Sequence, residues 1–124
     1  MRRLALIPLI LAALPAHALV PPEQAEDQVM RATYVCKDDA RLEAIFLNTA
    51  TGNSYAVLSH EDRPVWLEVA VSASGARYVS EVVDTGDDGP GMQFELWTKG
   101  DGATLSWLDG DATQPILTDC VMEE

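Results

Sequence analysis

The chain has 124 residues and a formal net charge of −12, with 48% hydrophobic and 23% charged residues. This length fits one domain, and the balance of hydrophobic and charged residues is that of a globular protein, which excludes a disordered chain. An acidic protein of this kind repels nucleic acid and anionic lipid, so we expect neither as a partner.

The first eighteen residues have the pattern of a signal peptide. Two arginines precede an apolar run over residues 4–14, and residues 16–18 supply the small side chains that signal peptidase recognises. The run is too short for a membrane-spanning helix, which needs roughly 20 apolar residues. No cysteine lies near the cleavage site to accept a lipid. We therefore expect cleavage before Leu19 and a soluble periplasmic product.

Removing residues 1–18 leaves six cationic side chains against twenty acidic ones, a net charge of −14. Such a field attracts basic partners at rates that fall with salt. The same charge also serves simply to keep an exported protein soluble.

Residues 19–32 show no strand pattern, and we expect a tail or a short helical lead-in there. From residue 33 the chain alternates with a period of two in short stretches rich in Val, Tyr, Trp and Thr, separated by turn residues. The expected strands are Thr33–Cys36, Leu42–Leu47, Tyr55–Leu58, Val65–Val71, Arg77–Val83, Gln93–Thr98, Thr104–Leu108 and Ile116–Val121. This spacing predicts a single all-β domain over residues 33–124, either a sandwich or a barrel.

The chain has two cysteines, Cys36 and Cys120, near the two ends of the patterned region. In an oxidising compartment an isolated pair of this kind is most simply a disulfide. The bridge would leave no free thiol for catalysis or for a metal.

Catalytic and metal-binding patterns are weak, and we expect no metal and no cofactor. His60 is the one histidine after residue 18, and its polar surroundings predict a solvated loop residue. Acidic stretches at 84–91 and 109–113 do not fit the ligand spacing of a calcium loop and are better explained as hairpin turns. A Ser74–Lys99 dyad would need a desolvated lysine, whereas Lys99 lies in a glycine-rich turn.

Two loops carry positive charge in this acidic chain. They read "SASGARY" at Ser72–Tyr78 and "WTKG" at Trp97–Gly100. An exposed Ser-Gly turn offers a hydroxyl and backbone amides, and the lysine offers a point charge. Together they suit a partner that presents carboxylates.

These two motifs, with "YVC" at Tyr34–Cys36 and the closing Cys120, resemble the periplasmic and membrane-bound inhibitors of C-type lysozyme. The resemblance covers nearly all of the chain after the signal peptide. It implies a small antiparallel β-barrel of about eight strands. It also implies that the protein is not an enzyme and that its partner is a C-type lysozyme.

The resemblance also implies the contact residues. Ser74 and Lys99 would address the catalytic carboxylates of the lysozyme. The remaining lysozyme-binding positions would shape the two loops: Gly75, Ala76, Arg77, Tyr78, Trp97 and Gly100. Simpler structural roles stay open for several of these, such as a positive φ at Gly75, core packing of Tyr78 and Trp97, and a surface ion pair of Arg77.

The chain departs from the family pattern in the segment that joins the motifs. Residues 79–96 are longer than expected and carry Asp84, Asp87 and Asp88, which predicts a protruding acidic hairpin. An envelope module that binds another basic protein or a small ligand in the barrel mouth remains the alternative function.

Overall fold

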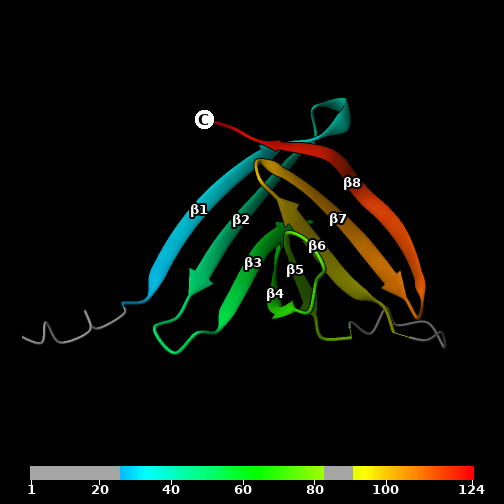
Figure 1. Cartoon of the computed structure of the whole chain (residues 1–124). Coiled ribbons are helices and arrows are strands. Elements are labelled where there is room, and N and C mark those ends of the chain that lie inside the picture. Colours follow the sequence, from blue (N-terminus) through cyan, green and yellow to red (C-terminus); the bar gives the residue numbers. More distant parts are fainter. Residues whose placement is uncertain (1–25, 83–90) are drawn as a thin grey trace, which may run out of the picture.

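The computed structural model describes residues 26–82 and 91–124. These residues form a closed antiparallel barrel in which each strand pairs with the next along the chain and the last pairs with the first (Figure 1). The elements are β1 (Gln28–Val35), η1 (Lys37–Asp39), β2 (Arg41–Asn48), β3 (Ser54–His60), β4 (Arg63–Ala70), β5 (Ala76–Ser80), β6 (Gln93–Lys99), β7 (Gly102–Asp109) and β8 (Ala112–Met122). The prediction of an all-β domain is confirmed, and the barrel replaces the sandwich alternative.

The period of two in the sequence becomes the inside and outside of the barrel. In β2, Leu42, Ala44 and Phe46 are buried while the residues between them are more exposed, as expected when successive side chains point to opposite faces of a sheet. The largest fully buried side chains are Tyr34, Leu42, Leu58, Leu67, Leu96, Leu105 and Cys120. The core therefore occupies the barrel interior.

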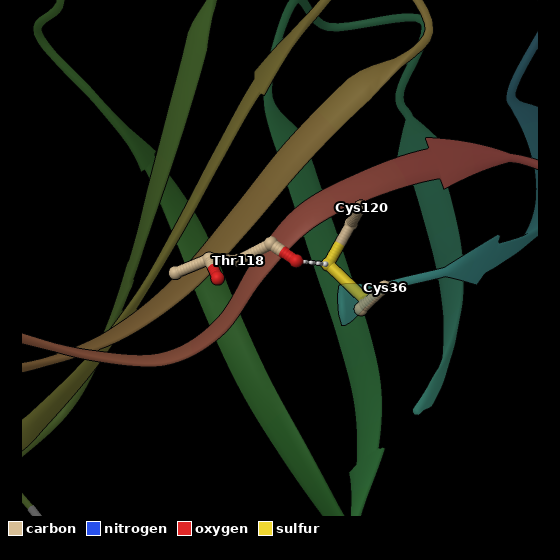
Figure 2. Close-up of a disulfide and its surroundings, with 3 residues drawn as sticks. All are labelled: Cys36, Thr118 and Cys120. Atoms are coloured by element: carbon tan, nitrogen blue, oxygen red, sulfur yellow. Dashed lines mark hydrogen bonds between the residues drawn. A yellow bond between two sulfur atoms is a disulfide. The ribbon is translucent and has the colours of Figure 1, made fainter. Parts of the chain in front are cut away.

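Closure between β1 and β8 is short and is reinforced covalently. The two strands share the register pairs Tyr34↔Met122 and Val35↔Val121. Next to these pairs, Cys36 and Cys120 form the predicted disulfide (Figure 2). The carbonyl oxygen of Thr118 lies 3.8 Å from the Cys120 sulfur. The bridge ties the residue after the first strand to the last strand.

The first strand begins earlier than predicted. β1 starts at Gln28 and pairs with β2 from Gln28↔Asn48 onward, so residues 28–32 are strand and not a tail or a helical lead-in. The four leading residues of β1 are all exposed, which removes the alternation that a half-buried strand would show.

Several predicted features lie outside the described residues. They are the signal peptide over 1–18, the start of the following segment, and the acidic hairpin with Asp84, Asp87 and Asp88. Within the described residues, no helix has the length and apolar character needed to cross a membrane.

Candidate functional site: two neighbouring loops

The two positive loops lie side by side at one end of the barrel. β5 follows the first loop, β6 precedes the second, and the two strands pair through Ala76↔Thr98 and Arg77↔Trp97. This register brings residues about twenty positions apart in the sequence to the same place. The two loops therefore belong to one surface of the barrel.

The first loop packs closely onto the strand that carries Lys99. Gly75 has φ +68°, and a Cβ at this position would lie 2.3 Å from the Thr98 carbonyl oxygen and 3.2 Å from Cβ of Lys99. Both the left-handed backbone and the lack of space demand glycine. Gly75 therefore permits the direct contact between the two loops.

Side chains fix the backbone at Ser74. Its carbonyl oxygen accepts a hydrogen bond from Nε1 of Trp97 at 2.9 Å and another from the hydroxyl of Ser72 at 2.7 Å. The Ser74 side chain is exposed, and its hydroxyl makes no hydrogen bond with residues 26–82 or 91–124. The peptide is held while the hydroxyl stays available to a partner.

The second loop is a tight hairpin that is held by backbone contacts. Lys99 ends β6 and pairs with Gly102 of β7, and Gly100 between them has φ +56°. The Asp101 carbonyl oxygen accepts a hydrogen bond of 2.8 Å from the backbone N–H of Met122 in β8. Lys99 is exposed and forms no ion pair with any acid in the described part of the chain. The backbone that carries its ammonium group is thus held in place by these backbone contacts.

Three other residues of the first motif connect the loop to the barrel. Arg77 forms an ion pair through Nε with the Glu95 carboxylate. Tyr78 is 7% exposed and packs against Phe46 with ring centroids 5.5 Å apart. Burial raises the pKa of the Tyr78 hydroxyl. Ala76 is partly buried and packs against the core.

The structural alternatives for these residues are therefore borne out at three positions: Gly75 has a positive φ, Tyr78 is a core residue, and Arg77 is half of an ion pair. Trp97 differs from the expected core residue, since it is 45% exposed and contacts the neighbouring loop. Ser72 is the residue that sequence reasoning missed, because its role depends on the folded position of the Ser74 carbonyl.

His60 does not occupy a solvated loop as predicted. It ends β3 in register with Arg63 and is half-buried, and its ring packs edge to face with that of Phe94, with ring centroids 5.2 Å apart. The prediction was wrong because the polar residues that follow His60 form a two-residue turn, which leaves His60 itself on the inner face of the strand.

Among the described residues, no three His, Cys, Asp or Glu side chains gather into a metal-binding group. Residues 109–113 span the turn between β7 and β8, as the hairpin interpretation predicted. A lysine that acts as a base must be desolvated, whereas Lys99 is exposed. The Ser74–Lys99 pair therefore does not meet the requirement for a catalytic dyad.

The sequence of the barrel matches that of a known family. Residues 34–114, more than half of the chain, match the family model MliC, described as the membrane-bound lysozyme inhibitor of C-type lysozyme. The chain belongs to this family. The matched range contains both positive loops and Cys36, and it ends before Cys120.

Two relatives place the chain within the MliC family more closely. It is 32% identical over 88 residues to a membrane-bound lysozyme inhibitor of C-type lysozyme from Cupriavidus necator, a match that covers 70% of this chain and 61% of that protein. It is also similar to the crystal structure of PliC-St, the periplasmic lysozyme inhibitor of C-type lysozyme from Salmonella typhimurium. That likeness has a TM-score of 0.62 and 30% identity, and covers 78% of this chain and all of PliC-St. Relatives of this chain are thus described both as periplasmic and as membrane-bound.

Proposed function

We propose that this protein is a periplasmic inhibitor of C-type lysozyme that presents the Ser74 hydroxyl and the Lys99 ammonium group to the catalytic carboxylates of the enzyme. Family membership and the names of both relatives support the target. In this proposal the protein binds and performs no chemistry of its own.

One observation carries the mechanism. The Ser74 loop rests on the Lys99 strand through Gly75, while both polar side chains remain exposed. A hydroxyl donor and an ammonium donor therefore lie on neighbouring loops that pack against each other. A pair of closely spaced carboxylates is the natural acceptor for such a pair of donors.

The chemistry of the target explains how such a pair would inhibit. Lysozyme cleaves its glycan with two carboxyl groups in a cleft, one ionised and one kept protonated by an apolar setting. An ammonium group in that cleft meets negative charge where water is scarce, which strengthens the hydrogen bond between charged groups. The inserted loops would also occupy the space that the sugar needs.

The supports at the base of the loops reduce the cost of binding. A loop that is already ordered loses little conformational entropy when it enters a cleft. The hydrogen bonds to the Ser74 carbonyl and the contact of Asp101 with β8 supply this order. The acidic field of the protein would guide a basic lysozyme toward it.

The test is a comparison of binding and inhibition for four proteins: the wild type, Lys99→Ala, Ser74→Ala and the double variant. Removing one partner of a desolvated charge pair costs about 2–5 kcal/mol, mainly through faster dissociation. Losing a hydrogen bond to a charged group costs about 1–2 kcal/mol. Because both side chains address the same carboxylates, the two losses should not add.

Arg31→Ala is the matched control, since it removes an exposed cation from β1, away from both loops. Its affinity for lysozyme should not fall. Lysis of cell walls by lysozyme should decrease in proportion to added wild-type protein. Absence of inhibition by the wild type would refute the function and favour a binding module with another target. Inhibition that survives Lys99→Ala within twofold would refute only the mechanism.

A further inference from the structure

A second concave site lies at the other end of the strands that carry the two loops. Its volume is about 610 Å³, within the range of small-molecule pockets, and β-barrel mouths are among the usual places for such sites. The residues that form it include His60, Trp66, Phe94 and Trp107. Phe94 and Lys99 are five positions apart in β6, which corresponds to about 17 Å along a strand. This pocket is therefore separate from the proposed lysozyme site.

Aromatic side chains line the pocket. Phe94 and Trp107 stack with ring centroids 3.8 Å apart and an interplanar angle of 29°. The His60 ring meets Phe94 edge-on at 5.2 Å. The ring of Trp66 on β4 lies tilted against the ring of Tyr55, with centroids 4.9 Å apart, and Trp66 is 50% exposed. Aromatic rings from β3, β4, β6 and β7 thus line the same cavity.

The rim of the pocket carries charges of both signs. Glu61, Glu81 and Arg63 line it together with the aromatic rings. An anionic ligand would approach two carboxylates in a protein that is already strongly acidic, so the rim disfavours anions. A ligand that covers the rim must also offer hydrogen-bonding partners to charged groups of both signs, because such groups are costly to leave unpaired.

A neutral ligand with hydroxyl groups satisfies the rim on both sides. Its hydroxyls can donate to the carboxylates of Glu61 and Glu81 and accept from the guanidinium of Arg63. An apolar ring face would cover the exposed indole surface. A pyranose ring has both properties, because its C–H bonds gather on a face and its hydroxyls lie around the edge.

We propose that this pocket binds a neutral saccharide, with a sugar ring against the Trp66 and Trp107 surfaces and its hydroxyls among Glu61, Glu81 and Arg63. The inference does not depend on the proposed function, since none of these residues belongs to the Ser74 and Lys99 loops.

The chain's three tryptophans provide the test with an internal control. Trp66 and Trp107 line the pocket, whereas Trp97 contacts the Ser74 loop. The indole N–H signals are followed by ¹H–¹⁵N NMR on the chain from Leu19 onward, which keeps residues 83–90, without lysozyme. The trimer of N-acetylglucosamine and the trimer of glucose are each titrated to about 10 mM, which would nearly saturate a site of 1 mM affinity.

We expect saturable shifts of Trp66 and Trp107 with at least one trimer while Trp97 stays in place. The proposal is overturned if the tryptophan signals do not shift with either trimer. It is also overturned if all three tryptophan signals shift without saturating.

Two variants keep the test independent of folding. Trp107→Leu should weaken binding about tenfold, but Trp107 also packs against Phe94. Trp66→Ala changes a half-exposed ring and should weaken binding severalfold in a protein that still folds. Trp97→Phe is the control and should bind sugar like the wild type. Unchanged affinity in both pocket variants would overturn the proposal.

Discussion

The Ser74 loop and the Lys99 turn are neighbours, yet the fold holds them in different ways. The carbonyl of Ser74 is held by two side chains, Trp97 and Ser72. The Lys99 turn is held by backbone pairing with Gly102 and by the N–H of Met122 on the Asp101 carbonyl. One support therefore depends on particular side chains, and the other on the closure of the barrel.

The difference has a consequence for how the two loops are coupled. Trp97 lies in β6, two residues before Lys99, and its indole binds the loop before β5. Movement of β6 would thus carry both polar side chains together. Since Gly75 also lies so close to β6 that an added Cβ would overlap it, the loops should respond to substitutions as a unit, although their supports can be removed separately.

The largest effect should come from removing the disulfide, which reinforces the support of the Lys99 turn. Cys36 and Cys120 are 84 positions apart, and a closed loop of this length contributes about 4–5 kcal/mol in the chain-entropy model. The Cys36→Ser/Cys120→Ser variant should lose stability of that order in urea unfolding. Amide hydrogen exchange should increase more at Asp101 and Gly102 than at Gly75. An equal increase in both loops would contradict the separate supports.

The next effect concerns the contact between the loops. Gly75→Ala combines a left-handed backbone with an overlap against the Thr98 carbonyl and should cost about 2–4 kcal/mol of stability. Gly110→Ala is the control, since Gly110 has φ +59° and a Cβ added there would meet nothing within 4 Å. It should cost only about 1–2 kcal/mol. Equal losses in the two variants would mean that the close approach at Gly75 is unimportant.

Sequence alone predicted the strands well because the barrel has a regular inside and outside. The family resemblance implied that Ser74 and Lys99 address the same carboxylates, which requires their two loops to lie together. Alternation cannot supply that placement, because it depends on the register between β5 and β6. Register is a property of the folded pair of strands and follows from which residues face the core.

The errors have the same origin. The exposed start of β1 shows no alternation, although its backbone pairs with β2 as far as Gln28. His60 stands among polar residues in the sequence but faces Phe94 across the barrel interior. The bond from Trp97 to Ser74 joins residues 23 positions apart and left no pattern to detect. Each feature depends on a partner that is distant in the sequence.

A smaller effect should follow from weakening the support of the Ser74 loop. Trp97→Phe keeps an aromatic ring but removes the N–H donor, and the loss of one such hydrogen bond is worth about 0.5–1.5 kcal/mol. If the proposed function holds, affinity for lysozyme should fall by a similar amount and the Ser74→Ala effect should shrink in this background. Trp66→Phe, at the other end of the barrel strands, should change neither quantity. A Ser74→Ala effect of unchanged size would show that Trp97 does not position Ser74.

The smallest effect distinguishes the two tyrosines beneath the loops. Burial raises the pKa of both Tyr34 and Tyr78 above the ordinary value of about 10, and the pKa of Tyr34 is raised further by Tyr78 and Asp101. The folded state therefore favours the protonated hydroxyls. Their contribution to stability is fully present below about pH 10 and is lost as the pH rises through the raised values.

Asp101 belongs to the Lys99 turn, so it provides a way to separate the two titrations. Asp101→Asn removes a negative charge near Tyr34 and should lower the pKa of Tyr34 slightly while leaving that of Tyr78 in place. Asp109→Asn, in the β7–β8 turn, should move neither. NMR titration of ¹³C-labelled tyrosine rings measures both values in one protein. A shift of Tyr78 as large as that of Tyr34 would mean that Asp101 acts on both tyrosines, and that the charge of the Lys99 turn reaches beneath the Ser74 loop as well.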